Sequence, residues 1–249
     1  MLLKNKTAVI TGSNRGIGKE ILKVFSENGS DIFACSRNLD NEFLSFIDNT
    51  KKQFNNNIIP IKIDLEKDEE VKNAAKKILS EKKNIDILIN NAGTIQTSLF
   101  QMTSIEKLKE IFQVNFFSQT LFTQYIIKSM IKNKSGSIVY ISSSAALDGN
   151  EGRNSYVATK AALISQAKVL SKELGSNNIR VNTIAPGLTN TDMMIQNTPS
   201  EVINDTVSKT SLRRVADPKD VANTALFLSS NMSSHITGQV IRVDGGMAS

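Results

Sequence analysis

Short apolar runs alternate with longer segments of helical apolar spacing along the chain. The apolar runs are too short for helices and are bounded by polar or glycine residues, so they predict buried strands. Strands that alternate with helices are typical of an α/β fold with a parallel sheet. We therefore expect one doubly wound domain over residues 1–249, a seven-stranded parallel sheet with helices on both faces. The predicted strands lie in residues 7–11, 31–36, 58–63, 85–89, 137–141, 179–185 and 238–246.

The longest helical pattern, residues 104–133, predicts one continuous helix and contains an unusual polar position. Asn115 interrupts an otherwise apolar stripe. A buried amide is costly unless it is hydrogen-bonded. Asn115 therefore either bonds a neighbouring strand for structural reasons or belongs to a functional site.

Composition and charge narrow the class of protein. The chain has 30 Lys and Arg against 24 Asp and Glu, a net charge of +6, which suits an anionic cofactor or substrate. Because the lysines are scattered, we do not expect nucleic-acid binding. The single cysteine, Cys35, excludes an intramolecular disulfide and lies in a strand pattern, which predicts a buried thiol. Lacking a signal-peptide pattern or long apolar segment, the chain is expected to be cytoplasmic, with no membrane span and no metal.

A glycine-rich turn connects the first predicted strand to the first predicted helix. Glycines let the backbone turn tightly and approach a pyrophosphate, while the helix N-terminus offers free N–H groups and a positive dipole end. This placement between a strand and a helix predicts a nucleotide-binding turn. Its residues are Gly12, Ser13, Asn14, Arg15, Gly16, Ile17 and Gly18.

The end of the second predicted strand indicates which dinucleotide binds. An acidic residue there would accept from a ribose 2′-hydroxyl and repel a 2′-phosphate. This chain has Arg37 at that position, with Arg15 in the glycine turn as a second cation. Guanidinium groups bind phosphate well, so we expect NADP(H) in preference to NAD(H). The alternative is that both arginines only face solvent.

Tyr156 and Lys160 stand four residues apart at the start of a predicted helix, so their side chains lie on one face. An ammonium group beside a phenol favours phenolate, which makes tyrosine a usable acid or base near neutral pH. Ser143 precedes them by a loop and is suited to bond the same substrate oxygen. Helices also carry a Tyr and a Lys four residues apart by chance, so this pattern alone is also compatible with a pair that has no catalytic role.

Several segments, in order along the whole chain, resemble the short-chain dehydrogenase/reductase family. The resemblance implies an NAD(P)-binding Rossmann fold, with a substrate lid at about residues 188–212 and assembly as a homotetramer. The matching segments are T-G-x-x-x-G-x-G at 11–18, N-N-A-G at 90–93, Y-x-x-x-K at 156–160 and P-G-x-x-x-T at 186–191.

The resemblance also implies roles for individual residues. Ser143 would hold the substrate oxygen and Tyr156 would exchange a proton with it. Lys160 would lower the phenol pKa and bind the nicotinamide ribose, and Asn115 would hold a water in the proton path. Asp64 would lie beside the adenine amino group, although it is equally suited to cap a helix starting near residue 66. The other implied cofactor contacts are Leu65, Asn91, Ala92, Gly93, Pro186, Gly187, Thr189 and Thr191, besides Tyr156 and Lys160.

Within the family the chain looks most like the 3-oxoacyl-(acyl-carrier-protein) reductases of fatty-acid synthesis. The likeness is carried by T-G-S-N-R-G-I-G at 11–18, A-P-G-L-T-N-T-D-M at 185–193 and I-T-G-Q-V-I-R-V-D-G-G-M at 236–247. Residues 94–98 depart from the Arg-Asp pair typical after N-N-A-G. Lys134 and Asn177 stand near the places of the arginines that meet the acidic carrier protein.

These features lead to three expectations of function. The first is an enzyme that reduces a carbonyl to an alcohol with NADPH, on a small or carrier-linked substrate. A second is a dehydrogenase of the same family acting on a sugar or a nucleotide-linked sugar in surface polysaccharide synthesis. The third, of another class, is a non-catalytic protein that senses NADP(H), although such a protein would not need Ser143, Tyr156, Lys160 and Asn115.

Overall fold

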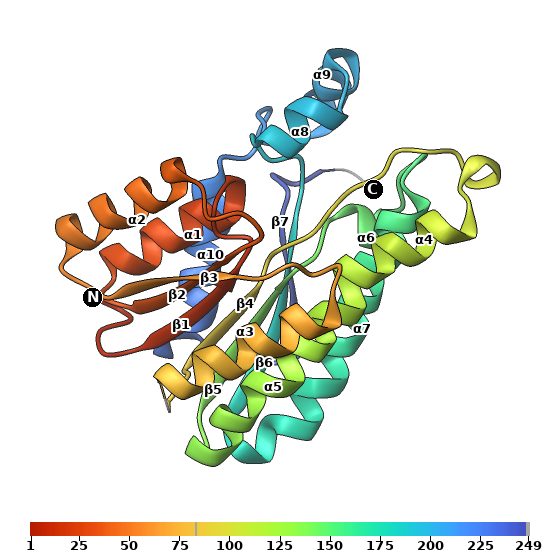
Figure 1. Ribbon diagram of the computed structural model, residues 1–249. Helices are drawn as coiled ribbons and strands as arrows, with labels where there is room; N and C mark the ends of the chain where they lie inside the picture. Colours follow the sequence, from red (N-terminus) through yellow and green to blue (C-terminus); the bar gives the residue numbers. More distant parts are fainter. Residues whose placement is uncertain (83, 248–249) are drawn as a thin grey trace.

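The structure, a computed structural model, describes residues 1–82 and 84–247. Seven parallel strands form one sheet in the order β3-β2-β1-β4-β5-β6-β7, with helices on both faces (Figure 1). The predicted doubly wound α/β fold is therefore confirmed. The strands are β1 (Thr7–Thr11), β2 (Asp31–Ser36), β3 (Ile58–Lys62), β4 (Ile87–Asn90), β5 (Gly136–Ile141), β6 (Ile179–Pro186) and β7 (Val240–Val243).

The central strands are apolar on both faces because helices cover both sides of the sheet. Successive side chains of β1 alternate between two hydrophobic clusters, with Val9 in one and Ala8 and Ile10 in the other. β1 lies between β2 and β4, so the order of strands reverses direction at this point. Open α/β sheets bind ligands at such a reversal, outside the carboxyl ends of the strands.

Two layers of helices bury the two faces of the sheet. α1 packs beside α10 in one layer, and α3 packs beside α5 in the other. None of the helices in the described residues is long and apolar enough to cross a membrane. The first layer contains α1 (Gly16–Glu27), α2 (Asn41–Phe54) and α10 (Pro218–Ser229), and the second contains α3 (Asp68–Glu81), α5 (Ser118–Asn133) and α7 (Asn154–Leu174).

The segment predicted as one helix at residues 104–133 is interrupted. α4 (Ile105–Phe112) joins α5 through a π-helical turn, η2 (Gln113–Phe117). A π turn holds an extra residue and shifts the direction of the side chains that follow. Asn115 lies in this turn and is fully buried. The irregular turn therefore places the amide in the interior beside the sheet.

The expected lid segment, residues 188–212, contains two helices that the weak apolar period did not predict. α8 (Asp192–Asn197) and α9 (Ser200–Lys209) stand above the carboxyl edge of the sheet (Figure 1). Neither helix has a fully buried side chain, which explains the weak pattern. Bridges from Thr189 to Ala216 and from Thr210 to Met247 anchor the two ends of the segment. The remaining short elements are η1 (Phe100–Met102), α6 (Ala145–Asp148), η3 (Gly175–Asn177) and η4 (Asn231–Ser233).

Candidate active site

The glycine turn after β1 is packed too tightly to accept side chains. A Cβ on Gly18 would lie 2.1 Å from Gly12 O and 2.5 Å from Asn91 Nδ2. Asn91 Nδ2 donates to the carbonyl oxygens of Thr11 at 2.9 Å and Gly12 at 3.1 Å. Thr11 Oγ1 accepts from the N–H groups of Asn91 at 3.0 Å and Ala92 at 3.1 Å. The N-N-A-G segment after β4 is thus bonded to the turn after β1.

The N-terminus of α1 is open to an anion. Arg15 is the N-cap residue but makes no side-chain capping bond, and the first N–H groups of a helix, here residues 16–18, lack intrahelical acceptors. Ser13 is buried, and its N–H and Oγ both donate to Cys35 O at 3.1 Å. The side chain of Ser13 therefore fixes the turn against β2, and the backbone of residues 12–18 forms the surface that fits a diphosphate.

The two arginines expected to select NADP(H) lie on neighbouring loops. β1 and β2 pair in parallel with Thr11 beside Cys35, so both loops leave the same edge of the sheet. The side chains of Arg15 and Arg37 are exposed. Arg37 Nη1 lies 3.2 Å from Glu66 Oε1 in an exposed ion pair. Exposed pairs contribute little free energy, so Glu66 does not prevent Arg37 from binding another anion.

Asp64 and Leu65 follow β3 and differ in what they offer a ligand. Asp64 Oδ1 accepts from the N–H of Glu66 at 3.0 Å. The N-cap of α3 is Lys67, so the alternative that Asp64 caps this helix is wrong. Leu65 is buried, and its carbonyl oxygen accepts from Ser118 Oγ at 2.5 Å. The Asp64 side chain is 15% exposed, and its Oδ2 lies 3.7 Å from Lys67 Nζ.

The four side chains expected to act on a substrate come together at the ends of β4 and β5 and the start of α7. Tyr156 lies in the first turn of α7, and Lys160 Nζ is 5.8 Å from the centre of its ring. Ser143 is hydrogen-bonded to the phenol. A Cβ on Gly93 would lie 3.2 Å from Asn115 Oδ1 and 3.3 Å from Lys160 Nζ. Gly93, which has no side chain, therefore borders the polar cluster formed by Asn115, Ser143, Tyr156 and Lys160.

Of the three serines after β5, Ser143 is the one turned toward this cluster. Ser142 is buried, and its Oγ donates to Lys160 O at 2.8 Å. Ser144 is buried as well. Ser143 is half-buried, and its Oγ accepts from Ala145 N–H at 3.3 Å. Ser143, the serine expected to bond the substrate oxygen, is therefore the one that lies beside the phenol.

Lys160 holds a buried ammonium group. Its side chain is only 3% exposed, and Nζ donates to Ile141 O at 2.8 Å. Burial lowers the pKa of Lys160 to about 8, because the charged form loses its hydration. Three donors and one bonded carbonyl leave the ammonium able to bind hydroxyl groups beside Gly93.

The phenol of Tyr156 is controlled by different groups from those expected. Burial raises the pKa of Tyr156, whereas the hydrogen bond with Ser143 and the charge of Arg153 lower it. Lys160, expected to lower this pKa, is not among the groups that do so in this structure. Lys160 Nζ donates to Ile141 O at 2.8 Å and lies 5.8 Å from the centre of the phenol ring. Sequence patterns did not indicate Arg153.

Asn115 ties the segment after β4 to α7. Its Oδ1 accepts from Thr94 N–H at 2.8 Å, and its Nδ2 donates to Thr94 O at 2.9 Å. Nδ2 also donates to Thr159 Oγ1 at 3.1 Å, and this hydroxyl donates to Tyr156 O at 2.7 Å. The structural role considered for Asn115 is therefore present, directly beside Lys160. Thr159 was missed, although it immediately precedes Lys160.

The segment after β6 runs from the polar cluster to the glycine turn. Pro186 ends β6, and Thr189 is buried, with its Oγ1 donating to Gly187 O at 3.0 Å. Thr191 Oγ1 accepts from Met194 N–H at 3.3 Å and caps α8. The Thr191 methyl group lies 3.2 Å from a Cβ position on Gly16. Thr191, rather than Thr189, therefore reaches the glycine turn.

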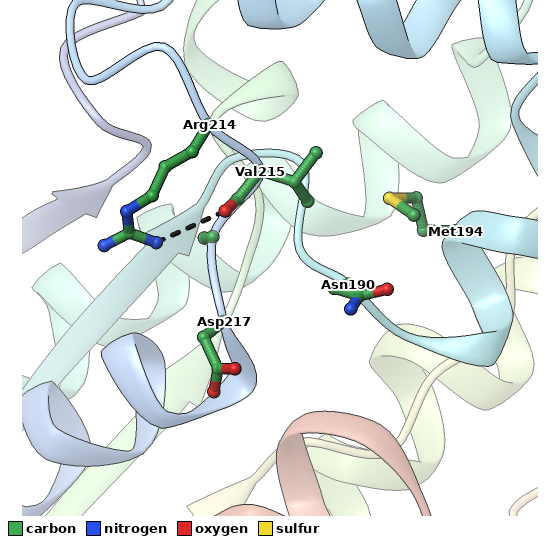
Figure 2. A pocket seen from close by; sticks show the side chains of 6 residues that line it. Asn190, Met194, Arg214, Val215 and Asp217 are labelled. Carbon is green, nitrogen blue, oxygen red and sulfur yellow. Dashed lines mark hydrogen bonds between the residues drawn. The ribbon is translucent and has the colours of Figure 1, made fainter.

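Two hollows lie between the lid and the body of the protein. The larger, of about 660 Å³, is bordered by residues 14–16, Lys19 and Thr191 among others. The smaller, of about 470 Å³, lies at the base of the lid and is lined by Asn190, Met194, Arg214 and Asp217 among others (Figure 2). In residues 1–82 and 84–247, no three His, Cys, Asp or Glu side chains are grouped to hold a metal ion.

Known proteins resemble this chain over its whole length. A family model described as enoyl-(acyl carrier protein) reductase matches residues 11–248. The chain is 40% identical over 247 residues to a 3-oxoacyl-(acyl-carrier-protein) reductase of Chlamydia muridarum, covering 99% of each chain.

Two solved structures have the same fold. A 7α-hydroxysteroid dehydrogenase complexed with NADH and 7-oxo glycochenodeoxycholic acid is 33% identical, with a TM-score of 0.94 over 99% of this chain and 95% of that chain. A protein designated an NAD(P)-dependent gluconate 5-dehydrogenase, from Beutenbergia cavernae with NADP at low occupancy, is 27% identical, with a TM-score of 0.93 over 98% and 97% of the two chains. The substrates given in the names of these similar proteins differ from one protein to the next.

The buried ammonium of Lys160 predicts how stability depends on pH. Its pKa of about 8 in the folded protein lies below the ordinary 10.5, so between these values the unfolded chain binds more protons and this group makes stability rise with pH. We expect Lys160→Met to exceed wild type in free energy of unfolding near neutral pH. The difference in free energy of unfolding between Lys160→Met and wild type should shrink as the pH rises from about 8 toward 10.5.

Urea unfolding followed by circular dichroism across this pH range measures the gap. Lys168→Met, on the same helix but exposed, is the matched control and removes no buried charge. A gap between Lys160→Met and wild type that is absent, or that widens with pH, contradicts the burial of a charged Lys160.

Proposed function

Because the chain belongs to the short-chain dehydrogenase/reductase family, it is an NAD(P)-dependent oxidoreductase acting on CH–OH or C=O groups, and we propose that it reduces a carbonyl to an alcohol with NADPH. The proposed substrate is a 3-oxoacyl thioester, as the name of its 40% identical relative suggests. One observation carries the proposal. Tyr156, hydrogen-bonded to Ser143, lies one helical turn from the buried ammonium of Lys160 at the carboxyl edge of the sheet.

The backbone along this edge fits a dinucleotide. The diphosphate contacts residues 12–18, where glycines and the α1 N-terminus leave N–H groups free. Asp64 and Leu65 border the adenine. Tyr156 and Lys160 would hold the nicotinamide half, and the further residues that would contact the cofactor are Asn91, Ala92, Gly93, Pro186, Gly187, Thr189 and Thr191. When bound, NADPH supplies the hydride that reduces the substrate.

The polar cluster supplies the proton. Ser143 and Tyr156 donate hydrogen bonds to the substrate carbonyl oxygen, and Tyr156 gives up its phenolic proton as negative charge develops there. Lys160 Nζ binds the nicotinamide ribose hydroxyls. Asn115 fixes the backbone of residues 93–94 beside Lys160 through its two bonds to Thr94, and we propose that Oδ1 also holds the water of the proton path.

Arg15 and Arg37 support a preference for NADP(H). Both are exposed on adjacent loops at the end of β1 and β2. Neither loop has an acidic residue at the position where one would meet the ribose 2′-hydroxyl. Two guanidinium groups suit a 2′-phosphate.

Residues 94–98 bear on which substrate the site accepts. Residues 94–98, which differ from the Arg-Asp pair expected there, pack against the loop before α7 and its first turn. Ser98 N–H donates to Gly152 O at 2.8 Å, and Ser155 Oγ donates to Gln96 Oε1 at 3.3 Å. The loop that differs thus borders the site. A sugar or a nucleotide-linked sugar is therefore the second candidate substrate, and the similarity to a gluconate 5-dehydrogenase favours including it.

Exposed apolar side chains around α4, α5 and α7 suit contact between copies of the chain. Phe117 is 51% exposed and packs with Phe112 and Phe116 at the junction of α4 and α5. Val169, on the neighbouring α7, is also exposed. We propose that these helices meet in a homotetramer, since such a patch is typical of a protein interface. The buried Cys35 thiol suits a reducing compartment.

Tyr156→Phe tests the proton donor. The variant keeps the ring but lacks the phenolic proton, so we expect NADPH binding close to wild type and loss of at least about 99% of kcat. Fluorescence titration measures binding, and steady-state NADPH oxidation measures kcat. Tyr125→Phe, on α5, is the matched control. Retention of more than about a tenth of kcat in Tyr156→Phe refutes the role of the phenol.

Arg37→Asp tests the cofactor preference. Loss of a charge-assisted phosphate contact should lower the ratio of kcat/KM for NADPH to kcat/KM for NADH by about tenfold or more. Arg213→Asp, an exposed arginine after α9, makes the same change of charge elsewhere. An unchanged ratio in Arg37→Asp would sink the proposed preference.

A substrate panel separates the three functions. We expect NADPH oxidation with a short 3-oxoacyl thioester and little with keto sugars. Turnover of keto sugars alone would replace the first candidate with the second. Binding of NADPH without turnover of any carbonyl in the panel would favour a protein that only senses the cofactor.

A further inference from the structure

Arg242 joins β7 to α6, which lies far from it in the sequence. Its Nη1 donates to Asp148 Oδ1 at 2.8 Å, and its Nη2 donates to Asp148 Oδ2 at 2.5 Å. Its Nε donates to Asp244 Oδ2 at 2.6 Å. Arg242 is 33% exposed, but Asp148 and Asp244 are only 14% and 6% exposed, so water screens these bonds less than those of a surface ion pair. The three bonds, called the Arg242 clamp below, hold two carboxylates on one guanidinium group.

Asp148 ends the short helical turn that follows the serines after β5. α6 begins at Ala145 and ends at Asp148, and none of its residues is fully buried. Ser143 O accepts from Ala146 N–H at 3.0 Å, and Ser144 O accepts from Asp148 N–H at 3.2 Å. A helix of one turn is not stable by itself. The geometry of this turn therefore depends on contacts from outside it, and the backbone of Ser143 belongs to the turn.

The C-terminal turn that contains Asp244 lies beside the segment after β6 and the base of the lid. A Cβ on Gly187 would lie 2.8 Å from Asp244 Cα. Two residues beyond Asp244, Gly246 O accepts from Ser211 N–H at 3.2 Å and from Ser211 Oγ at 2.8 Å, at the end of the lid. The Arg242 clamp therefore links α6 to the segment that packs on Gly187 and anchors the lid.

We propose that Arg242 is a positioning residue, whose clamp on α6 keeps Ser143 Oγ in place to bond the substrate carbonyl oxygen. Arginine suits this task because its planar fork bonds two carboxylates at once, whereas the ammonium group of a lysine is a single point of charge. The part that Arg242 plays in turnover rests on the proposed function, since the substrate contact of Ser143 does. The clamp itself is a property of the folded protein and can be measured without substrate.

Single-turnover kinetics in two backgrounds test the role in turnover. Arg242→Gln removes the clamp, and we expect the rate of carbonyl reduction to fall about tenfold or more with little change in the Kd of NADPH, because small displacements of groups that touch the substrate slow the chemistry strongly. In Ser143→Ala the serine hydroxyl is absent, so adding Arg242→Gln should lower the rate by less than about twofold. Arg242→Lys keeps the charge without the fork and should lie between wild type and Arg242→Gln.

Hydrogen exchange tests the clamp without substrate. The amides of residues 145–149 should exchange about tenfold faster in Arg242→Gln and in Asp148→Asn than in wild type, because the turn opens more often. Lys6→Gln is the matched control, since it breaks the 3.0 Å ion pair of Lys6 with Asp86 at the opposite edge of the sheet. It should leave both the rate and this exchange at their wild-type values. Circular dichroism checks the fold of each variant.

The outcomes separate this inference from the proposed function. Unchanged exchange at residues 145–149, a wild-type rate in Arg242→Gln, or an equal loss of rate with and without the Ser143 hydroxyl overturns the role of Arg242. Should Arg242→Gln not fold, Asp148→Asn takes its place in both measurements. If Tyr156→Phe is inactive while one of these results is found, only this inference fails. If Tyr156→Phe stays active, or wild type reduces no carbonyl, the proposed function fails instead.

Discussion

The structure depends on the close approach of two backbones at the carboxyl edge of the sheet. Gly18 packs onto the carbonyl of Gly12, and Asn91 bonds the carbonyls of Thr11 and Gly12. Because no side chain separates them, the turn after β1 lies directly on the end of β4, and the N-terminus of α1 opens over the same edge. The other parallel strands deliver their loops to this edge, which is why distant segments of the chain meet there.

The second half of the site depends on polar groups that the fold buries and holds. Asn115 is satisfied by Thr94 and Thr159, whereas Lys160 is buried as a cation with a backbone carbonyl as its acceptor. Burial raises the pKa of Tyr156 and lowers that of Lys160, so both charged forms are disfavoured in the resting protein. Such unfavourable burial is tolerated mainly at functional sites, where a ligand or a developing charge relieves it.

The sequence predicted the sheet, and the shared helix face of Tyr156 and Lys160, because both depend on local patterns. Strands covered on both faces are continuous apolar runs, and the spacing of Tyr156 and Lys160 is set by one helical turn. The π turn at Asn115 could not be predicted, because its residues keep the ordinary helical period. α8 and α9 expose their faces and so lack a pattern. Arg153 donates to the carbonyl oxygen of Asn197, which is distant in sequence, and the direction of Lys160 Nζ likewise depends on the fold.

Hydride transfer to a carbonyl carbon is measured most directly by isotope labelling. The protein is mixed with 3-oxobutyryl thioester and NADPH that carries deuterium at both C4 positions, and the product is analysed by mass spectrometry and NMR. We predict a 3-hydroxybutyryl thioester with one deuterium on the carbon bearing the new hydroxyl group, formed by the wild type and not by Tyr156→Phe. An unlabelled alcohol, or no alcohol although NADPH binds, would contradict the proposed reaction.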